Sequence, residues 1–256
     1  MKILVSIKQV PEREAPVRLN AAATWIDEDG LQWAMNESDA YALEEGLQLK
    51  EKHGGEVIVL TAGPERVGST LREALAKGAD RAIHVDADLT ALDTLAVARL
   101  LAAAIRAESP DLVLTGLQSD DLGSGQTGVL LGELLNLPHA SLILHVEKTD
   151  AGIHVKRELE EGWFQSIDLP TPAVLSIQSG GAKLRYATLM GIKKAKTKEL
   201  RRVDPAALGV DAAPLAAVLE KLAAPTRQKS TQFIPGAPAE AAAALVEKLR
   251  FEARVL

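Results

Sequence analysis

The strongest constraint on the fold is an alternation of short apolar runs and helical patterns over the first half of the chain. The apolar runs are residues 2–7, 57–61, 81–85 and 111–115. The helical patterns between and after them are residues 36–53, 66–77, 92–108 and 129–135. Strands that alternate with helices in this way form a parallel sheet that is covered by helices on both faces. The sequence therefore predicts a Rossmann-like, doubly wound α/β fold.

The pattern changes after Pro138, and the rest of the chain is expected to extend this sheet and then leave it. Further strands are predicted at residues 141–147, 153–158, 163–169 and 173–177, with turns between them that favour an antiparallel extension. From Gly191 the chain is basic and then rich in alanine and proline, before a last amphipathic helix at residues 240–251. We expect a domain over residues 1–190 and, over residues 191–256, a basic segment with a C-terminal arm that packs on a partner chain.

A glycine-rich loop at residues 116–128 lies between a predicted strand and a predicted helix. Free backbone N–H groups and the positive end of the helix dipole make such a loop a site for anions. Gly123, Gly125 and Gly128 also match a dinucleotide-binding pattern, but six residues separate them from Gly116 at the end of the strand, too far for the true motif. Phosphate binding is therefore expected, and the alternative is a plain helix start in which the glycines serve the turn.

Composition excludes several classes of protein. The chain has 256 residues, of which 47% are hydrophobic and 25% charged, with a net charge of −6 and no cysteine. Disulfides and thiolate chemistry are excluded, and nucleic acid is not the expected partner. The N-terminal run is too short for a signal peptide, and no apolar run is long enough to span a membrane, so a cytoplasmic location is expected.

The residues also lack a convincing catalytic set. The five histidines show no metal-ligand spacing, and no nucleophile elbow or Walker lysine is present. Asp120 and Asp121 are adjacent and are expected to serve a turn rather than to act as a pair. The lysine run at residues 193–198 is either a solvated face or, beside Leu189 and Met190, a docking surface. The residues alone therefore indicate a binding protein without its own bond-making groups.

Several motifs, taken in order, mark a known family. The matching segments are residues 2–11, Met35 and Asn36 with the acidic helix that follows, residues 71–85, 124–128, 155–176 and 185–196. They include the sequences LREALAKGADRAIHV, SGQTG and VKRELEEG. Over residues 1–202 the chain resembles the beta subunit of electron-transfer flavoprotein, and the SGQTG loop resembles that of the AMP-binding group of this family.

The resemblance implies a heterodimer. In this family the alpha subunit holds most of the redox-active FAD, and the beta subunit holds a structural AMP. Electrons arrive from acyl-CoA or other flavin dehydrogenases and leave to a quinone oxidoreductase at the membrane. The alternatives are a bifurcating variant with a second FAD in place of AMP, a free-standing adenine-nucleotide-binding regulatory module, and a NAD-dependent dehydrogenase. The last lacks a catalytic base and a properly placed fingerprint.

The resemblance also implies site residues. The AMP site would comprise Ser6, Asn36, Glu37, Ser38, Asp39, Ala62, Gly116, Leu117, Gln118, Ser119, Asp120, Asp121, Leu122, Gly123, Ser124, Gly125, Gln126 and Thr127. The N–H groups of Gly125, Gln126 and Thr127 would take the phosphate. Recognition of partner dehydrogenases would fall to Tyr186, Leu189, Met190, Lys193 and Lys194, with Leu189 as the anchor. Arg13 stands where some members place an aromatic side chain near the flavin, so no flavin contact is expected there.

Overall fold

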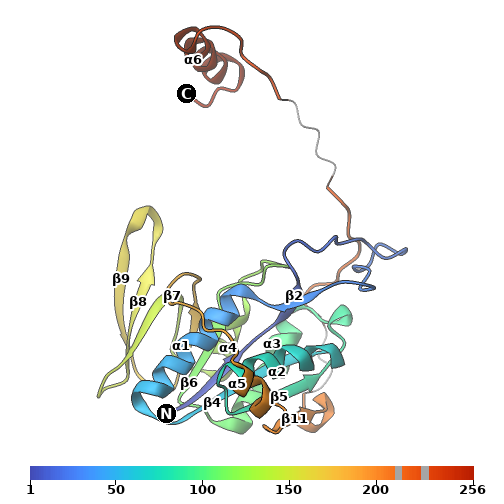
Figure 1. The fold of residues 1–256 in the computed structure, drawn as a ribbon, viewed down its shortest axis with the longest axis vertical. Coiled ribbons are helices and arrows are strands. Elements are labelled where there is room, and N and C mark those ends of the chain that lie inside the picture. The colour runs from blue at the N-terminus through green and yellow to red at the C-terminus, as the bar shows by residue number, and fades with distance from the viewer. Residues whose placement is uncertain (211–214, 226–230) are drawn as a thin grey trace. The chain divides into compact units, whose positions relative to one another are not determined.

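The computed structural model describes residues 1–210, 215–225 and 231–256. Residues 211–214 and 226–230, which belong to the expected arm, lie outside the described residues. The chain divides into two compact units, Met1–Leu222 and Ala223–Leu256, each of which is described here by itself (Figure 1).

The first unit is built on one nine-stranded sheet. In spatial order its strands are β11 (Leu200–Val203), β5 (Arg81–Asp86), β4 (Glu56–Gly63), β1 (Lys2–Ser6), β6 (Leu112–Gly116), β10 (Ala173–Ile177), β7 (His139–Lys148), β8 (Ile153–Glu158) and β9 (Phe164–Leu169). The strands from β11 to β7 are parallel, and β8 is antiparallel to both of its neighbours, β7 and β9. The predicted mostly parallel sheet with an antiparallel extension is confirmed.

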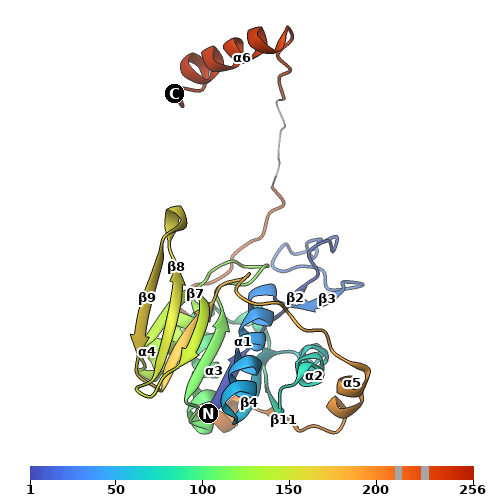
Figure 2. The same cartoon turned by 60° about the vertical axis from the view of Figure 1, so that its left-hand side comes forward.

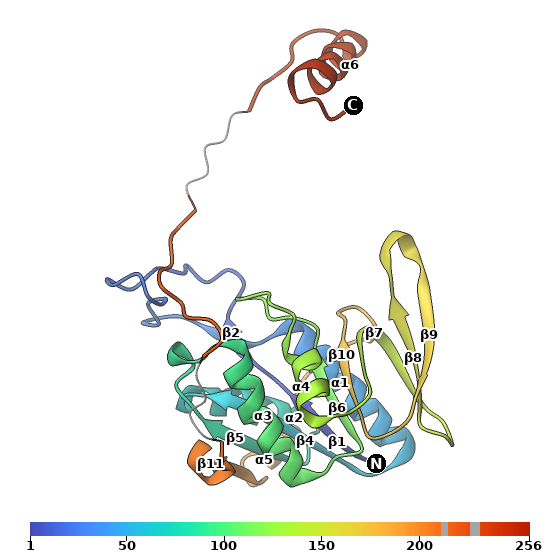
Figure 3. The same cartoon turned by 180° about the vertical axis from the view of Figure 1, so that it is seen from behind.

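Helices cover the two faces of the parallel part, as expected for a doubly wound sheet (Figures 1 and 3). The helices of the first unit are α1 (Glu37–His53), α2 (Gly68–Lys77), α3 (Thr94–Glu108), α4 (Thr127–Leu135) and α5 (Leu189–Ala195). One core cluster joins apolar side chains of α1, α2 and α5 to the sheet, and the other joins those of α3 and α4. Alternate residues of β1 divide between the two, with Ile3 and Val5 in the first and Leu4 in the second, so both faces are buried.

Strand β10 corrects one expectation. We expected residues 173–177 to belong to the antiparallel extension, but β10 lies between β6 and β7 and is parallel to both. Every residue of β10 is buried, from Ala173 to Ile177. The run Ala-Val-Leu-Ser-Ile suits this position because a strand inside a parallel sheet is covered on both faces.

The domain boundary expected between residues 190 and 191 is displaced, because the first unit extends to Leu222. Helix α5 packs on α2, and a side chain at Gly191 would place its Cβ atom 2.2 Å from the carbonyl oxygen of Ala76. Arg72 donates to the carbonyl oxygens of Ala195 and Lys198 at 2.6 and 2.8 Å. Packing and hydrogen bonds therefore hold the basic segment on the domain before the chain continues into the edge strand β11.

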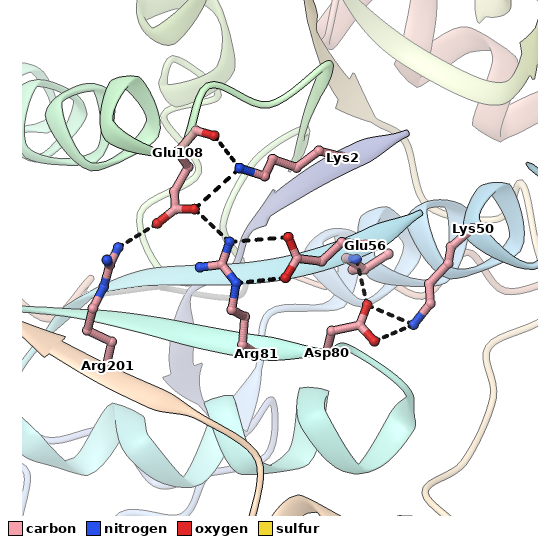
Figure 4. A network of polar contacts seen from close by, with 8 residues as sticks. Lys2, Lys50, Glu56, Asp80, Arg81, Glu108 and Arg201 are labelled. Carbon is pink, nitrogen blue, oxygen red and sulfur yellow. Dashed lines mark hydrogen bonds and ion pairs between the residues drawn. The ribbon is translucent and has the colours of Figure 1, made fainter. Parts of the chain in front are cut away.

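A network of charges closes the sheet at the amino ends of the strands (Figure 4). Glu108, at the end of α3, binds Arg81 of β5 at 2.6 Å and Arg201 of β11 at 2.5 Å. Arg81 also binds Glu56 of β4, at 2.7 Å. The hydrogen bond from Arg81 lowers the pKa of the Glu108 carboxyl, so this group stays charged. The network occupies the edge opposite to the one at which ligands bind in such folds.

The segment after β1 forms a small second sheet, in which β2 (Gln9–Pro11) pairs with β3 (Trp33–Met35). Between them, Leu19 and Ile26 form an antiparallel bridge. We call residues 12–32 the excursion. At the other side of the main sheet, the β8–β9 hairpin projects beyond the helices (Figure 2).

The second unit contains α6 (Pro238–Glu247) and a π-helical turn, Lys248–Glu252. This confirms the predicted last helix, which begins at the proline because a helix tolerates proline in its first turn. None of the described residues of this unit is buried. In the described part of the chain, no helix is both long and apolar enough to cross a membrane.

Candidate functional site

A cavity of about 880 Å³ opens at the carboxyl ends of the central strands. Ser6 ends β1, Ala62 lies near the end of β4, and Gly116 ends β6, and all of them line this cavity. The glycine-rich loop forms another part of its wall. The cavity therefore lies where ligands bind in doubly wound sheets, as the sequence predicts.

Asp39 connects the ends of two strands beneath the cavity. Its carboxylate accepts a hydrogen bond from the backbone N–H of Lys8, just after β1, and another from that of Gly116, each at 2.8 Å. A Cβ atom at Gly116 would lie 2.3 Å from Asp39 Oδ1, so only glycine fits this contact. Burial raises the pKa of the Asp39 carboxyl from its usual 3.8 to about 7.

Asn36 and Ser38 hold the start of the glycine-rich loop. The amide of Asn36 donates to the carbonyl oxygen of Gln118 and accepts from the N–H of Asp120, both at 2.9 Å. The hydroxyl of Ser38 donates to the same carbonyl oxygen at 2.7 Å. Asn36 is the N-cap residue of α1, but within the described part of the chain its side chain makes no capping hydrogen bond. The Asn36 side chain instead forms its hydrogen bonds with the glycine-rich loop.

The end of the loop offers unpaired donors to the cavity. Gly123 and Gly125 have φ angles of +63° and +62°, which glycine adopts without strain. Among the described residues, the backbone N–H groups of residues 124–127 donate no hydrogen bond, and α4 begins at Thr127. Ser124, Gly125, Gln126 and Thr127 line the cavity. Backbone donors and a helix N-terminus thus lie together in the cavity wall, an arrangement that fits the phosphate of a nucleotide.

The structure brings most of the predicted site residues to the cavity wall, but not all of them. Those that line it are Ser6, Asn36, Asp39, Ala62, Gly116, Leu117, Gln118, Ser119, Asp121, Leu122, Ser124, Gly125, Gln126 and Thr127. Glu37, Ser38, Asp120 and Gly123 are not part of the wall; Glu37 pairs with Arg13 at 3.0 Å. The carboxylate of Asp121 accepts from the N–H of Leu122, and that of Asp120 from the N–H of Glu37.

Sequence reasoning missed Lys8. Its ammonium group lies 2.6 Å from Asp121 Oδ1 and 3.3 Å from Ser119 Oγ, so it ties the loop to the end of β1. The position of Lys8 just after the first strand could have indicated a role in the site, because side chains there lie at the ligand-binding edge of the sheet.

Another part of the wall was also missed. Arg66 binds Glu28 at 2.8 Å and stacks over the Trp33 ring at 3.6 Å. The guanidinium group also donates to Gln9. Glu28 comes from the excursion and Gln9 and Trp33 from the small sheet, whereas Arg66 lies in the helical turn Glu65–Val67 after β4. Their positions depend on contacts distant in sequence, so no local pattern could have indicated them.

The predicted recognition residues form an exposed apolar surface. Tyr186, Leu189 and Met190 are 91%, 87% and 63% exposed, and Lys193 and Lys194 are exposed beside them. We call these residues the docking surface. Its base is fixed, because Arg185 binds Glu44 at 2.8 Å and Glu51 at 2.6 Å.

Among the described residues, no group of three or more histidine, aspartate or glutamate side chains could hold a metal ion. His84 is instead a buried strand residue, with its ring nitrogen 2.7 Å from the carbonyl oxygen of Gly63.

The raised pKa of Asp39 predicts a pH-dependent contribution to stability. A folded-state pKa above the unfolded value means that the stabilising contribution is complete below pH 3.8 and is lost as the pH rises through about 7. Asp39→Asn should be less stable at low pH, because its NH₂ group would face an N–H donor. Its deficit in unfolding free energy should shrink by up to about 4 kcal/mol between pH 4 and pH 8.

Urea unfolding of the parent chain and of the Asp39→Asn variant at several pH values measures this difference. A deficit that does not change with pH would show that the carboxyl titrates normally.

Comparison with known proteins identifies the family. The family model described as "Electron transfer flavoprotein domain" matches residues 23–208. The electron transfer flavoprotein subunit beta of Methylophilus methylotrophus is 37% identical over 257 residues, which cover 96% of this chain and 97% of that protein. The subunits of Bacillus subtilis (strain 168) and Homo sapiens are each 34% identical over 100% of this chain and cover 100% and 99% of their own lengths. The chain belongs to the family of electron transfer flavoprotein beta subunits.

Proposed function

We propose that this chain binds AMP as a structural ligand in the cavity at the carboxyl ends of β1, β4 and β6. The observation that supports the proposal is the set of N–H groups at residues 124–127, which donate no hydrogen bond among the described residues and lie in the cavity wall at the start of α4. They would hold the phosphate, while Ser6, Asp39 and Ala62 would lie along the adenosine. Asn36, Ser38 and Lys8 would keep the loop in the binding conformation.

By its family, the chain is the small subunit of an electron carrier and pairs with an alpha subunit. We further propose that the alpha subunit holds most of the FAD, which supplies the redox chemistry of the complex. Electrons would come from acyl-CoA or other flavin dehydrogenases and pass to a quinone oxidoreductase, with the heterodimer in the cytoplasm. This chain would supply binding and docking residues, not catalytic ones.

The test is the nucleotide content of the heterodimer. Heating the co-expressed complex should release FAD and AMP in equal amounts, which mass spectrometry identifies. Two FAD molecules and no AMP would instead favour a bifurcating variant. A chain that purifies without an alpha subunit and retains AMP would favour the free-standing module.

We propose that the segment Ala223–Leu256 packs on the alpha subunit. The support is its lack of buried side chains among the described residues, since a segment without a core cannot offset its loss of chain entropy. Trypsin should cleave within residues 231–256 quickly in the isolated chain and slowly in the heterodimer, as followed by mass spectrometry. Equal cleavage rates in the two states would contradict this packing.

We propose that the docking surface anchors dehydrogenases. An exposed apolar side chain beside lysines suits a transient partner, because the anchor fixes the position and the charges set the rate of encounter. Leu189→Ala should weaken this association by about 1–3 kcal/mol, the loss for a buried aliphatic anchor. Flavin reduction by a dehydrogenase should slow, whereas reduction by dithionite should not change.

Val17→Ala is the matched control, because Val17 is an exposed aliphatic residue outside the docking surface. Substitution of Lys193 and Lys194 should instead alter how the reduction rate depends on ionic strength. If Leu189→Ala is reduced as fast as the parent complex, the docking role is wrong.

A further inference from the structure

The cavity has a wall that the sequence did not suggest. Residues 215–219, from the alanine-rich segment after β11, line it together with the glycine-rich loop. This segment belongs to the first unit, which extends to Leu222. We call residues 215–222 the strap. Figure 3 shows the strap in orange, beside the amino end of α3 and the blue excursion.

One end of the strap is fastened to α3. The Oδ2 atom of Asp93 accepts hydrogen bonds from the N–H groups of Ala216 and Ala217, at 2.6 and 3.0 Å. The Oδ1 atom accepts from the N–H of Ala96 at 2.7 Å and so caps α3. A single carboxylate thus holds both the helix start and the strap, and Asp93 itself lines the cavity.

The other end of the strap is fastened to the excursion. The N–H of Leu222 donates to the carbonyl oxygen of Ala23 at 2.7 Å. Trp25 and Ile26, which follow closely in the excursion, line the cavity. The strap therefore joins two walls of the cavity that come from distant parts of the sequence.

The strap brings apolar side chains to a cavity whose other end is polar. Leu215, Val218 and Leu219 line the cavity, and their side chains remain 38%, 72% and 44% exposed. Leu89, Leu92, Val97 and Leu101 add apolar surface from the loop after β5 and from α3. An apolar planar group bound here would cover these side chains, while the N–H groups of residues 124–127 take an anion.

We propose that the strap closes the nucleotide cavity over the base and sets how long the nucleotide stays bound, with Asp93 as the positioning residue. This inference rests on the proposed binding of AMP. It adds residues 215–222 to the site. The rate of nucleotide release then depends on the hydrogen bonds that hold the strap, to Asp93 at one end and to Ala23 at the other.

Two variants remove the hydrogen bonds between Asp93 and the strap, one by changing the donors and the other by changing the acceptor. Replacing Ala216 and Ala217 together with proline removes both N–H donors and leaves Asp93 and its cap on α3 intact. Asp93→Ser keeps a hydroxyl that can cap α3 but is too short to reach the strap as well. The control is Ala224→Pro, because among the described residues the N–H of Ala224 donates no hydrogen bond.

The experiment uses the intact heterodimer loaded with radiolabelled AMP and follows release after a chase with unlabelled AMP. Loss of hydrogen bonds to a carboxylate should speed release roughly tenfold in both strap variants. The control should release AMP at the parental rate, and the flavin spectrum should be the same in all of them.

The outcomes separate the two proposals. Parental release rates in both strap variants would overturn the role of the strap and leave AMP binding intact. Faster release in Asp93→Ser alone would assign the effect to the α3 cap and would also overturn it. A parent heterodimer that neither contains nor takes up AMP would overturn the proposed function, and the strap inference with it.

Discussion

Gly116→Ala should destabilise the chain by about 3 kcal/mol, because overpacking and lost hydrogen bonds add together at this position. The new Cβ atom would lie 2.3 Å from both Asp39 Oδ1 and Ser38 Oγ and 2.7 Å from the backbone nitrogen of Asp39. Movement of α1 away from β6 would relieve the overlap only by breaking the hydrogen bond from the Gly116 N–H to Asp39. The fold and the cavity floor should therefore weaken together.

Gly68→Ala is the matched control for this variant. Gly68 has helical backbone angles at the start of α2, and no atom of the described residues contacts a Cβ atom added there within 4 Å. It should be neutral or slightly stabilising, because alanine has the higher helix propensity. Urea unfolding of the parent and of both variants gives the comparison. A Gly116→Ala chain as stable as the parent would mean that α1 and β6 are not held together in the described way.

Gly125→Asp should abolish AMP binding. The carboxylate would face the phosphate, and like charges about 4 Å apart repel by roughly 4 kcal/mol at the effective dielectric of a protein surface. A loss of this size corresponds to roughly thousandfold weaker binding. The heterodimer should then purify with FAD but without AMP, as measured by mass spectrometry of the released nucleotides.

Gly125→Asn separates charge from backbone strain. Gly125 has a φ angle of +62°, and asparagine tolerates this left-handed region better than most residues while having nearly the shape of aspartate. The asparagine variant should keep most of its AMP. Equal AMP content in the aspartate variant and the parent would contradict the assignment of the phosphate to this loop.

The strands of the main sheet and the helices up to residue 135 could be predicted because each has a strong local pattern, whereas the short β2 and β3 were missed. The apolar run of β1 and the spacing of Leu43 and Leu47 on α1 define their elements without any knowledge of neighbours. The place of the glycine-rich loop followed from the same patterns, since a loop after a parallel strand lies at the ligand-binding edge.

Pairing between distant segments could not be predicted in the same way. A five-residue run such as β10 carries the same pattern at the centre of a sheet as near its edge. An asparagine amide such as that of Asn36 can serve either a helix end or a loop, and here it binds the carbonyl oxygen of Gln118 in the loop. The strap has no periodicity, because its place depends on Asp93 and Ala23 rather than on a core of its own.

The position of β10 also has a consequence for synthesis of the chain on the ribosome. The strands β7, β8 and β9 emerge before β10, but β7 joins the parallel sheet only through β10. Until residue 177 has emerged, the β6 edge of the first half and the β7 edge of the second half remain open to foreign strands. The sheet is therefore completed late by contacts of high sequence separation, the step at which such folds are slowest and most exposed to aggregation.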